Sequence, residues 1–492
     1  MKKRVNERRI AREKHSETKK KNFPVETEPN GLWQRLRAWP FLLIIIAIII
    51  VAVLVLANQC SSKESHNTSF AAKADFWPQG QDAGIPCDYL LVNATIVDGS
   101  GGASYKGNIA VKDDLIVGVG DFIASFDAYI IDASDLIVAP GFIDIHTHSD
   151  DYWPSGGDGS PILSQGITTH IVGNCGNAPA DIAAYLKQVD YGAINVGTFV
   201  GYKVLCEKRG PTPEGQAVSA EALKLMQQQL KKGLTEGAFG ISLGLSYYPQ
   251  NQGTFAEFVA LAETCKEADA LMAIHIRDEG DQVVESLEEA LKVAEKTGVS
   301  LQYSHVKAAG KANWSKQDRV LELFDQAIAS GLDVAGDAYV YTFSSNDLGG
   351  SNESISAENI KKVLSNDHVM LASDGGLNDQ GKAIHPRAYA NSTMFLISYV
   401  REQQLLSLEE AVYKMTYLPA QRVKIPNRGL LKVGNKADLV VFKLEDLKVN
   451  ATRGNPSQLS EGMSYVFVNG KMVIEKGNFA GVKAGRALKF SL

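Results

Sequence analysis

Residues 138–150 read VAPGFIDIHTHSD, a largely apolar run followed by two histidines separated by one residue. Apolar side chains at Phe142 and Ile145 indicate a buried strand, which ends in His146 and His148. Side chains two positions apart on a strand point to the same face, so both imidazoles leave the end of this strand together. Two converging imidazoles can share a divalent metal ion, although two hydrogen-bonded histidines without a metal would also fit.

The composition is that of a globular protein with a large core. The chain has 492 residues, of which 45% are hydrophobic and 22% charged, enough for two domains or one large barrel with additions. The net charge is −6, yet residues 1–38 are rich in Lys and Arg, so the rest of the chain is more acidic than the total. An acidic body argues against nucleic acid as a partner. The five cysteines are too scattered for a disulfide framework.

The first 86 residues are expected to form a tail, a membrane anchor and a linker. Residues 1–40 are polar and basic, and residues 58–86 form a polar linker. Between them, residues 41–57 read FLLIIIAIIIVAVLVLA, which spans about 25 Å as a helix, the short end of a membrane crossing. The positive charge before the span predicts a single-pass signal-anchor, with the tail cytoplasmic and the bulk of the protein on the non-cytoplasmic side of the membrane. A signal peptide cleaved after Ala57 and a lipoprotein anchored at Cys60 are the alternatives.

Short β-like runs mark both sides of the remaining chain. They fall in residues 87–140 and again in residues 425–492, where Asn469-Gly470 is a strong hairpin signal. The economical interpretation is one small β-sandwich built from both segments.

Between these segments, residues 141–424 alternate apolar runs with helical patterns. Helix-like spacing occurs in residues 220–232, 254–268, 281–296 and 316–330. Alternating strands and helices predict parallel strands with crossover helices, and eight such units predict an α/β fold, a (β/α)8 TIM-like barrel. The expected strands are residues 142–148, 167–173, 194–200, 237–243, 271–276, 300–305, 332–337 and 368–374.

Side chains that bind metals recur where these strands end. Cys175 follows the second strand, His275 and His305 end the fifth and sixth, and Asp374 ends the eighth. Taken singly, each has an ordinary structural explanation, as a buried thiol, a hydrogen-bonded imidazole or a helix cap. Barrel enzymes, however, place their chemistry at the C-terminal ends of the strands. The joint pattern therefore predicts a metal centre made of His146, His148, Cys175, His275, His305 and Asp374. We expect no part in it for His170, His368, Cys87, Cys206 or Cys265.

Several further motifs resemble the N-acyl-D-amino-acid deacylase (D-aminoacylase) family of the amidohydrolase superfamily. The likeness covers about residues 87–480 and includes the H-x-H motif, GITT at 166–169, GNCG at 173–176, GLSYYP at 244–249, SHVK at 304–307 and HPR at 385–387. The resemblance implies a tightly bound Zn²⁺ on Cys175, His275 and His305. It also implies a second, weaker metal position on His146, His148 and Asp374, and a substrate carboxylate held by Tyr247, Lys307 and Arg387.

The implied activity is zinc-dependent hydrolysis of the amide bond of an N-acyl-D-amino acid or a short peptide with a D-terminal residue. Zinc would polarise the acyl carbonyl and activate water, and Asp374 would be the catalytic general base. The alternatives are a cyclic amidase of the hydantoinase or dihydroorotase kind, a deaminase, and a catalytically inactive membrane-tethered binding protein. Cys175 replaces the carboxylated lysine of most hydantoinase-type enzymes and argues against a cyclic amidase. Tyr247 and Arg387 argue against a deaminase, and the full set of metal-site residues argues against an inactive protein.

The sequence departs from the family pattern in two places. The connection between residues 337 and 368 is shorter than usual, which suggests a more open pocket that admits larger acyl groups or short peptides. In addition, His170 occupies a strand position where the family usually has an apolar residue.

Overall fold

The computed structural model describes residues 84–124, 127–210, 218–345 and 353–491. The tail, the anchor expected at residues 41–57 and almost all of the linker lie outside these residues. Within the described ranges, no helix combines the length and apolar character that crossing a membrane requires.

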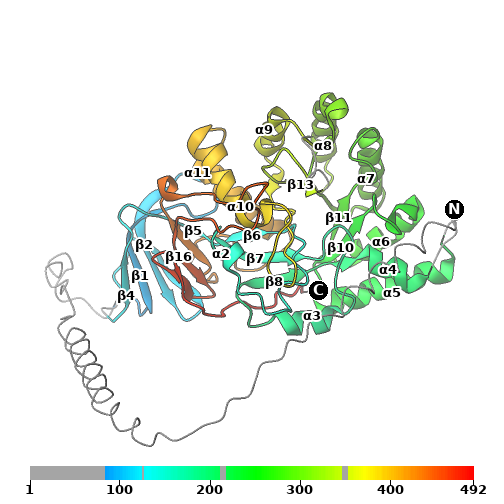
Figure 1. Cartoon of the computed structure of the whole chain (residues 1–492). Helices are drawn as coiled ribbons and strands as arrows, with labels where there is room; N and C mark the ends of the chain where they lie inside the picture. Colours follow the sequence, from blue (N-terminus) through cyan, green and yellow to red (C-terminus); the bar gives the residue numbers. More distant parts are fainter. Residues whose placement is uncertain (1–83, 125–126, 211–217, 346–352, 492) are drawn as a thin grey trace, which may run out of the picture. The chain divides into compact units, whose positions relative to one another are not determined.

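Parallel strands form a barrel at the centre of the described residues (Figure 1). They are β6 (Phe142–Asp144), β7 (Ile167–Val172), β8 (Asn195–Thr198), β9 (Val200–Gly201), β10 (Gly240–Gly244), β11 (Leu271–His275), β12 (Ser300–Tyr303), β13 (Val334–Ala338) and β14 (Val369–Leu371). Strands β6 to β8 form one sheet and β9 to β14 a second. Phe199 alone separates β8 from β9, so these two act as one strand that joins the sheets.

The barrel closes where the chain segments after β6 and β14 meet. The amide of Asp374 donates to the carbonyl of His146 at 2.8 Å, and the amide of His148 donates to the carbonyl of Gly375 at 2.7 Å. With β8 and β9 taken as one, the described residues therefore form eight strands in a closed parallel barrel, and the predicted TIM-like fold is confirmed. The closure also places the H-x-H motif directly beside Asp374.

Helices cover the outside of the barrel, as the apolar spacing predicts. They are α2 (Ser160–Leu163), α3 (Ile182–Val189), α4 (Tyr202–Arg209), α5 (Ala220–Glu236), α6 (Phe255–Glu267), α7 (Val283–Thr297), α8 (Gln317–Ala329), α9 (Ala357–Ser365), α10 (Arg387–Phe395), α11 (Leu408–Met415) and α12 (Tyr417–Arg422). Helix α7 is representative, because it buries Val283, Leu287, Ala290 and Val293 along one face. Ser219 caps α5 through its side chain, and Gly237 ends that helix in the left-handed conformation.

The barrel interior is apolar below its C-terminal end. Ile143, Ile171, Ala273, Ala335 and Met370, from five of the strands, belong to one buried cluster. Strands buried on both faces read as apolar runs rather than as alternating patterns. The polar side chains at the C-terminal ends of these strands therefore lie directly above a packed apolar core.

The two outer segments share one sheet, so both contribute to a single β unit, as predicted. Their strands are β1 (Tyr89–Ile96), β2 (Tyr105–Lys112), β3 (Leu115–Gly120), β4 (Tyr129–Asp132), β5 (Ile137–Pro140), β15 (Leu439–Phe442), β16 (Met463–Val468), β17 (Lys471–Glu475) and β18 (Asn478–Phe479). Strands β5 and β15 pair antiparallel and join the segments. Leu91, Ile109, Leu439 and Phe467 lie in one apolar cluster. The predicted hairpin at Asn469-Gly470 connects β16 and β17, and both residues have positive φ.

Candidate active site

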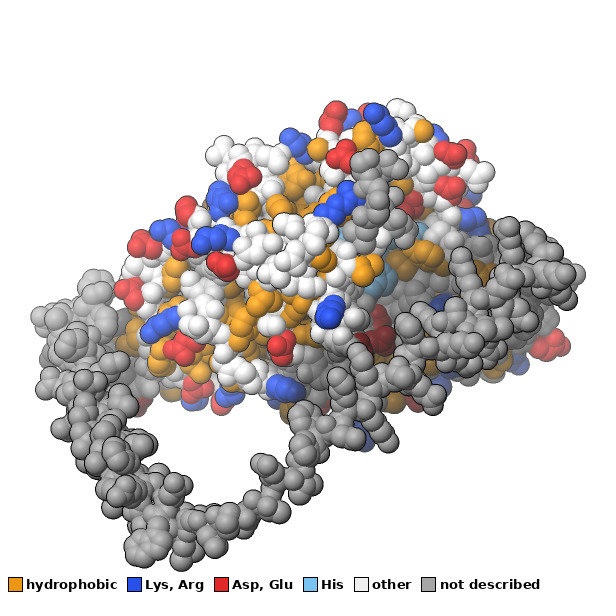
Figure 2. Space-filling model, in the orientation of Figure 1, with side chains coloured by type: hydrophobic (Ala, Val, Ile, Leu, Met, Phe, Trp, Pro, Cys, Tyr) orange, Lys and Arg blue, Asp and Glu red, His pale blue; other side chains and the backbone are white. Residues whose placement is uncertain are grey.

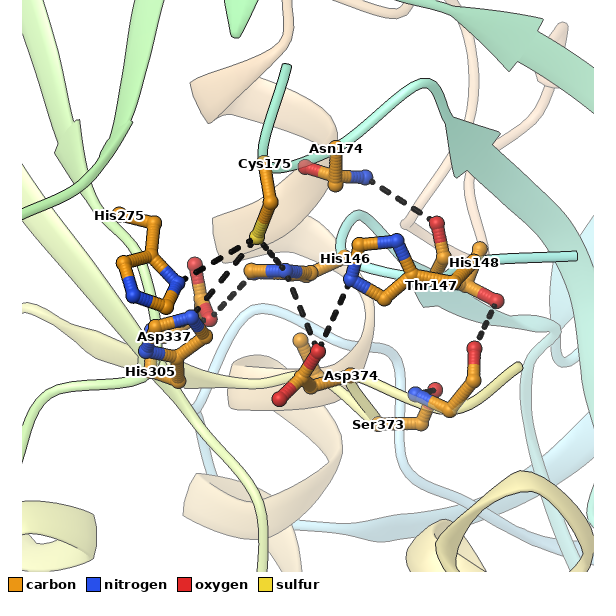
Figure 3. A network of polar contacts seen from close by, with 12 residues as sticks. His146, Thr147, His148, Asn174, Cys175, His275, His305, Asp337, Ser373 and Asp374 are labelled. Atoms are coloured by element: carbon orange, nitrogen blue, oxygen red, sulfur yellow. Dashed lines mark hydrogen bonds and ion pairs between the residues drawn. The ribbon is translucent and has the colours of Figure 1, made fainter. Parts of the chain in front are cut away.

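A cluster of imidazoles surrounds the Cys175 thiol at the C-terminal end of the barrel (Figure 3). Cys175 Sγ lies 3.4 Å from His146 Nε2, 3.7 Å from His275 Nδ1 and 3.8 Å from His305 Nε2. Zinc bonds of about 2.3 Å to sulfur and about 2.05 Å to nitrogen at a tetrahedral angle separate these atoms by roughly 3.6 Å. The distances from Cys175 Sγ to His275 and His305 match this separation, and the possible ligand atoms of His146, Cys175 and His305 all lie within 4.8 Å of one another.

Asp374 forms a second group with the two histidines of the H-x-H motif. Its Oδ1 lies 3.1 Å from His148 Nε2 and 3.5 Å from His146 Nε2. The possible ligand atoms of these three residues all lie within 4.8 Å of one another. The structure thus brings together all six residues expected at the metal centre, and His146 belongs to both groups.

Three of these residues have a strained backbone. Cys175, His305 and Asp374 have φ values of 51°, 39° and 46°, in the left-handed region that non-glycine residues seldom occupy. Each follows the end of a barrel strand within three residues. Gln250 supports one of these turns, because its Nε2 donates to the carbonyl of Cys175 at 3.0 Å. The turns direct all three side chains over the barrel mouth.

Each imidazole around Cys175 is also held at its other nitrogen. The pairs are His146 Nδ1–Asp337 Oδ1 at 3.0 Å, His305 Nδ1–Glu279 Oε1 at 2.6 Å and His275 Nε2–Ser246 Oγ at 2.8 Å. Such partners orient a metal-binding imidazole and select its tautomer. Sequence reasoning missed these partners. Their places in the sequence could have suggested them, because Asp337 lies in an expected strand and Glu279 follows His275 by four residues.

A cavity of about 250 Å³ opens beside the metal-binding cluster. In Figure 2, histidine side chains reach the surface on this face, bordered by hydrophobic side chains. The cavity is lined by His148, Tyr247, His275, Glu279, His305, Lys307, Tyr339, Ser344, Ser345, Asp374, Gly376, Ile384, His385 and Arg387. The three residues expected to bind a carboxylate, Tyr247, Lys307 and Arg387, are therefore in one place.

Arg387 is built into the wall of this cavity. Its Nη2 lies 2.9 Å from Asp374 Oδ2 and donates to Ser345 Oγ at 3.0 Å, and its guanidinium stacks 4.4 Å from the ring centre of Tyr339. Its Nε and Nη1 and the hydroxyl of Tyr339 are buried without a hydrogen-bond partner among the described residues. The sequence did not single out Tyr339 or Ser345. Both residues come after the C-terminal end of β13, and this position was the only feature of the sequence that pointed to them.

Known proteins resemble this chain in sequence and in structure. The sequence profile of the Amidohydrolase family matches residues 137–473. The chain belongs to the amidohydrolase family. This amidohydrolase is 30% identical over 477 residues to a D-aminoacylase of Alcaligenes xylosoxydans xylosoxydans, covering 82% of the chain and 98% of the relative. It is 33% identical over 455 residues to an N-acyl-D-glutamate deacylase of the same organism, covering 78% of the chain and 93% of the relative.

A solved structure also resembles this amidohydrolase. It is the N-acyl-D-glutamate deacylase of Bordetella bronchiseptica, which contains zinc and a phosphonate inhibitor that mimics the tetrahedral intermediate. The TM-score is 0.75 at 30% identity, and the match covers 82% of this chain and all of that one. The resemblance to the D-aminoacylase family that the sequence motifs suggest is therefore confirmed.

The two acidic side chains expected to bind metal in this amidohydrolase, Cys175 and Asp374, are stabilised in their charged forms. Burial raises the pKa of the Cys175 thiol, but the cationic imidazoles of His146 and His148 lower it well below its ordinary value. Burial likewise raises the pKa of Asp374, but Arg387 and the neighbouring histidines hold it well below its ordinary value. A thiolate and a carboxylate are the forms that bind metal ions.

The residues not expected at the metal centre lie elsewhere in the amidohydrolase. Cys87, Cys206 and Cys265 are buried free thiols. His170, on β7, is buried with its ring 5.4 Å from that of Trp153, and neither ring nitrogen has a hydrogen-bond partner among the described residues. Burial alone lowers the pKa of His170 to about 3. Asp144 Oδ2 lies 3.9 Å from His170 Nε2, too far for a hydrogen bond, so burial dominates and favours the neutral imidazole.

Proposed function

We propose that this protein is a zinc-dependent N-acyl-D-amino-acid deacylase, which hydrolyses the amide bond to release a carboxylate and a D-amino acid. The observation that carries the proposal is the position of Lys307 and Arg387 in the cavity that His275 and His305 also line. A metal-binding cluster beside two cations suits a substrate with an acyl amide at one end and a carboxylate at the other.

Cys175, His275 and His305 hold the tightly bound zinc in this proposal. Their soft and borderline donors suit zinc, and Cys175 Sγ lies 3.7 Å from His275 Nδ1 and 3.8 Å from His305 Nε2, as two ligands of one zinc ion would. His146, His148 and Asp374 form the weaker second position. A zinc ion in this centre supplies Lewis-acid polarisation of the acyl carbonyl and lowers the pKa of water.

Asp374 is the catalytic residue that moves the proton. Its two oxygens face different partners, since Oδ1 lies near His148 and Oδ2 near Arg387. Its depressed pKa keeps it ionised, so it accepts a proton from the attacking water and delivers that proton to the leaving amine nitrogen. A carboxylate between metal ligands and substrate is placed for both transfers.

Lys307, Arg387 and Tyr247 hold the free carboxylate of the substrate. Arg387 lines the cavity beside Lys307, and two of its guanidinium nitrogens, Nε and Nη1, have no hydrogen-bond partner among the described residues. With the carbonyl fixed at the metal centre and the carboxylate fixed at these residues, the side chains of the two enantiomers point in different directions. The D enantiomer is the one expected to fit.

A panel of N-acyl amino acids tests this function. Zinc-loaded full-length protein is incubated with paired N-acetyl-D- and N-acetyl-L-amino acids, and free amino acid is measured. We expect release from D substrates only, and we expect it to persist as the acyl group grows, because the connection between β13 and β14 is short. Preference for L substrates would refute the proposal, as would hydrolysis of hydantoin or dihydroorotate instead. A sharp limit at small acyl groups would refute the open pocket.

We also propose that residues 41–57 anchor the enzyme in a membrane, with the barrel on the non-cytoplasmic side. The length and apolar character of this segment and the basic residues before it support this arrangement. Protease added to spheroplasts should then digest the barrel. Protection of the barrel, under conditions where a known exterior domain is digested, would reverse the topology.

A further inference from the structure

Glu279 lies between the metal-binding cluster and the carboxylate-binding residues. Its Oε1 is 2.6 Å from His305 Nδ1 and 2.6 Å from Lys307 Nζ. The side chain is 17% exposed and lines the cavity. One carboxylate oxygen therefore contacts both a proposed zinc ligand and a proposed substrate-binding cation.

The backbone around Glu279 fixes this position. The carbonyl of Glu279 accepts a hydrogen bond from the amide of Ala309 at 2.6 Å, so the segments after β11 and β12 are tied together. The adjacent Asp278 accepts from the amide of Gly280 at 2.5 Å, and its own amide donates to Ser286 Oγ in α7. The carboxylate is thus presented by a rigid turn.

We propose that Glu279 is a positioning residue that couples zinc binding to recognition of the substrate carboxylate, and that its charge selects substrates with neutral D side chains. This inference rests on the proposed function. With zinc bound at Nε2, on the side of Cys175, Nδ1 of His305 would carry the proton and donate it to Glu279, and Lys307 Nζ lies 3.1 Å from the same nitrogen. The same oxygen accepts from the ammonium of Lys307, which sets that cation in the cavity.

The selectivity follows from the charges around the cavity. Among the described residues that line it, the permanent cations are Lys307 and Arg387, and each already faces a carboxylate, Glu279 and Asp374 respectively. These two cations can accept the single carboxylate of a substrate with a neutral side chain. A second carboxylate, as in N-acyl-D-glutamate, would lie in the same small cavity as the negative charge of Glu279 and be repelled. The relatives include enzymes named for both kinds of substrate, so similarity alone does not decide between them.

Glu279→Gln tests both parts, because it removes the charge and keeps the shape. Full-length variants are compared for zinc retention against a chelator, and for kcat and KM on N-acetyl-D-leucine and N-acetyl-D-glutamate. We expect zinc affinity to fall by about ten- to a hundred-fold. We also expect the ratio of kcat/KM for the glutamate over the leucine substrate to rise at least about tenfold, the size of a 1.4 kcal/mol change.

Two further variants separate the effect of the charge of Glu279 from effects of side-chain length and of losing a carboxylate elsewhere. Glu279→Asp keeps the charge but shortens the side chain, so it should retain the preference for N-acetyl-D-leucine while binding zinc less tightly. Glu289→Gln is the matched control, because Glu289 is a partly buried carboxylate 3.0 Å from Arg277 and outside the cavity lining. It should leave both readouts unchanged.

Wild-type zinc affinity in Glu279→Gln would overturn the positioning role, and an unchanged substrate ratio would overturn the selectivity. If the wild-type protein hydrolyses neither D substrate, the proposed function fails. The chelator measurement still decides whether Glu279 supports His305.

Discussion

Arg387 Nη2 lies 2.9 Å from Asp374 Oδ2, so a residue expected to bind the substrate carboxylate also contacts the expected general base. Both side chains are buried at the mouth of the barrel. The guanidinium keeps Asp374 ionised against the effect of burial, which raises its pKa. In the proposed mechanism, substrate recognition and proton transfer therefore depend on the same ion pair.

Asp374→Asn should abolish most turnover while keeping the tightly bound zinc. An amide cannot accept the proton from water, and loss of a general base costs about 10²–10⁴ in rate. The thiolate and two imidazoles of the tight position do not include Asp374, so zinc content should change little. Turnover and zinc content are measured on the same preparation, with the surface variant Asp269→Asn as control. Near wild-type turnover in Asp374→Asn would mean that another group is the base.

Arg387→Met should weaken the use of substrates with a free carboxylate. Loss of a charge-assisted pair costs on the order of 1.5–3 kcal/mol, or roughly ten- to a hundred-fold in kcat/KM. The substitution also disturbs Asp374, so the informative quantity is the ratio between an N-acyl-D-amino acid and its C-terminal amide. That ratio should fall in the variant. An equal loss for acid and amide would remove Arg387 from carboxylate binding.

His170→Val should make the protein less sensitive to acid. Burial lowers the pKa of His170 to about 3 in the folded protein, whereas the unfolded chain has the ordinary value of 6.5. Between these values the unfolded state binds more protons, so stability is lost as the pH falls below 6.5, by up to about 1.4 kcal/mol per unit. Unfolding midpoints at pH 7.5 and 5 should therefore differ less for His170→Val than for wild type. The exposed His368→Gln is the control, and identical pH dependence in all three proteins would contradict the assignment.

The sequence predicts the barrel and the residues that gather at its C-terminal end, because both depend on local pattern. A residue such as His275 or His305 ends an apolar run, and the ends of parallel strands share one edge of the barrel. The partners behind the imidazoles do not follow from such a pattern. Glu279 reaches His305 and Lys307 only because a turn after β11 meets the segment after β12, which is tertiary information.

The Arg387 environment shows the same limit. The HPR motif marks the residue, but its contacts with Asp374, Ser345 and Tyr339 come from three different parts of the chain. The burial of His170 beside Trp153 likewise depends on packing between segments. Local sequence predicts the strand or turn on which a reactive side chain lies. The residues that contact it depend on tertiary packing and do not follow from local sequence.

The decisive measurement is zinc content together with turnover in Cys175→Ala, because Cys175, His275 and His305 are proposed to hold the zinc on which hydrolysis depends. Wild type and the buried-thiol control Cys265→Ala should each retain roughly one tightly held zinc per chain and hydrolyse N-acetyl-D-amino acids. Cys175→Ala should lose both the metal and the activity. Undiminished zinc and turnover in Cys175→Ala would contradict the account.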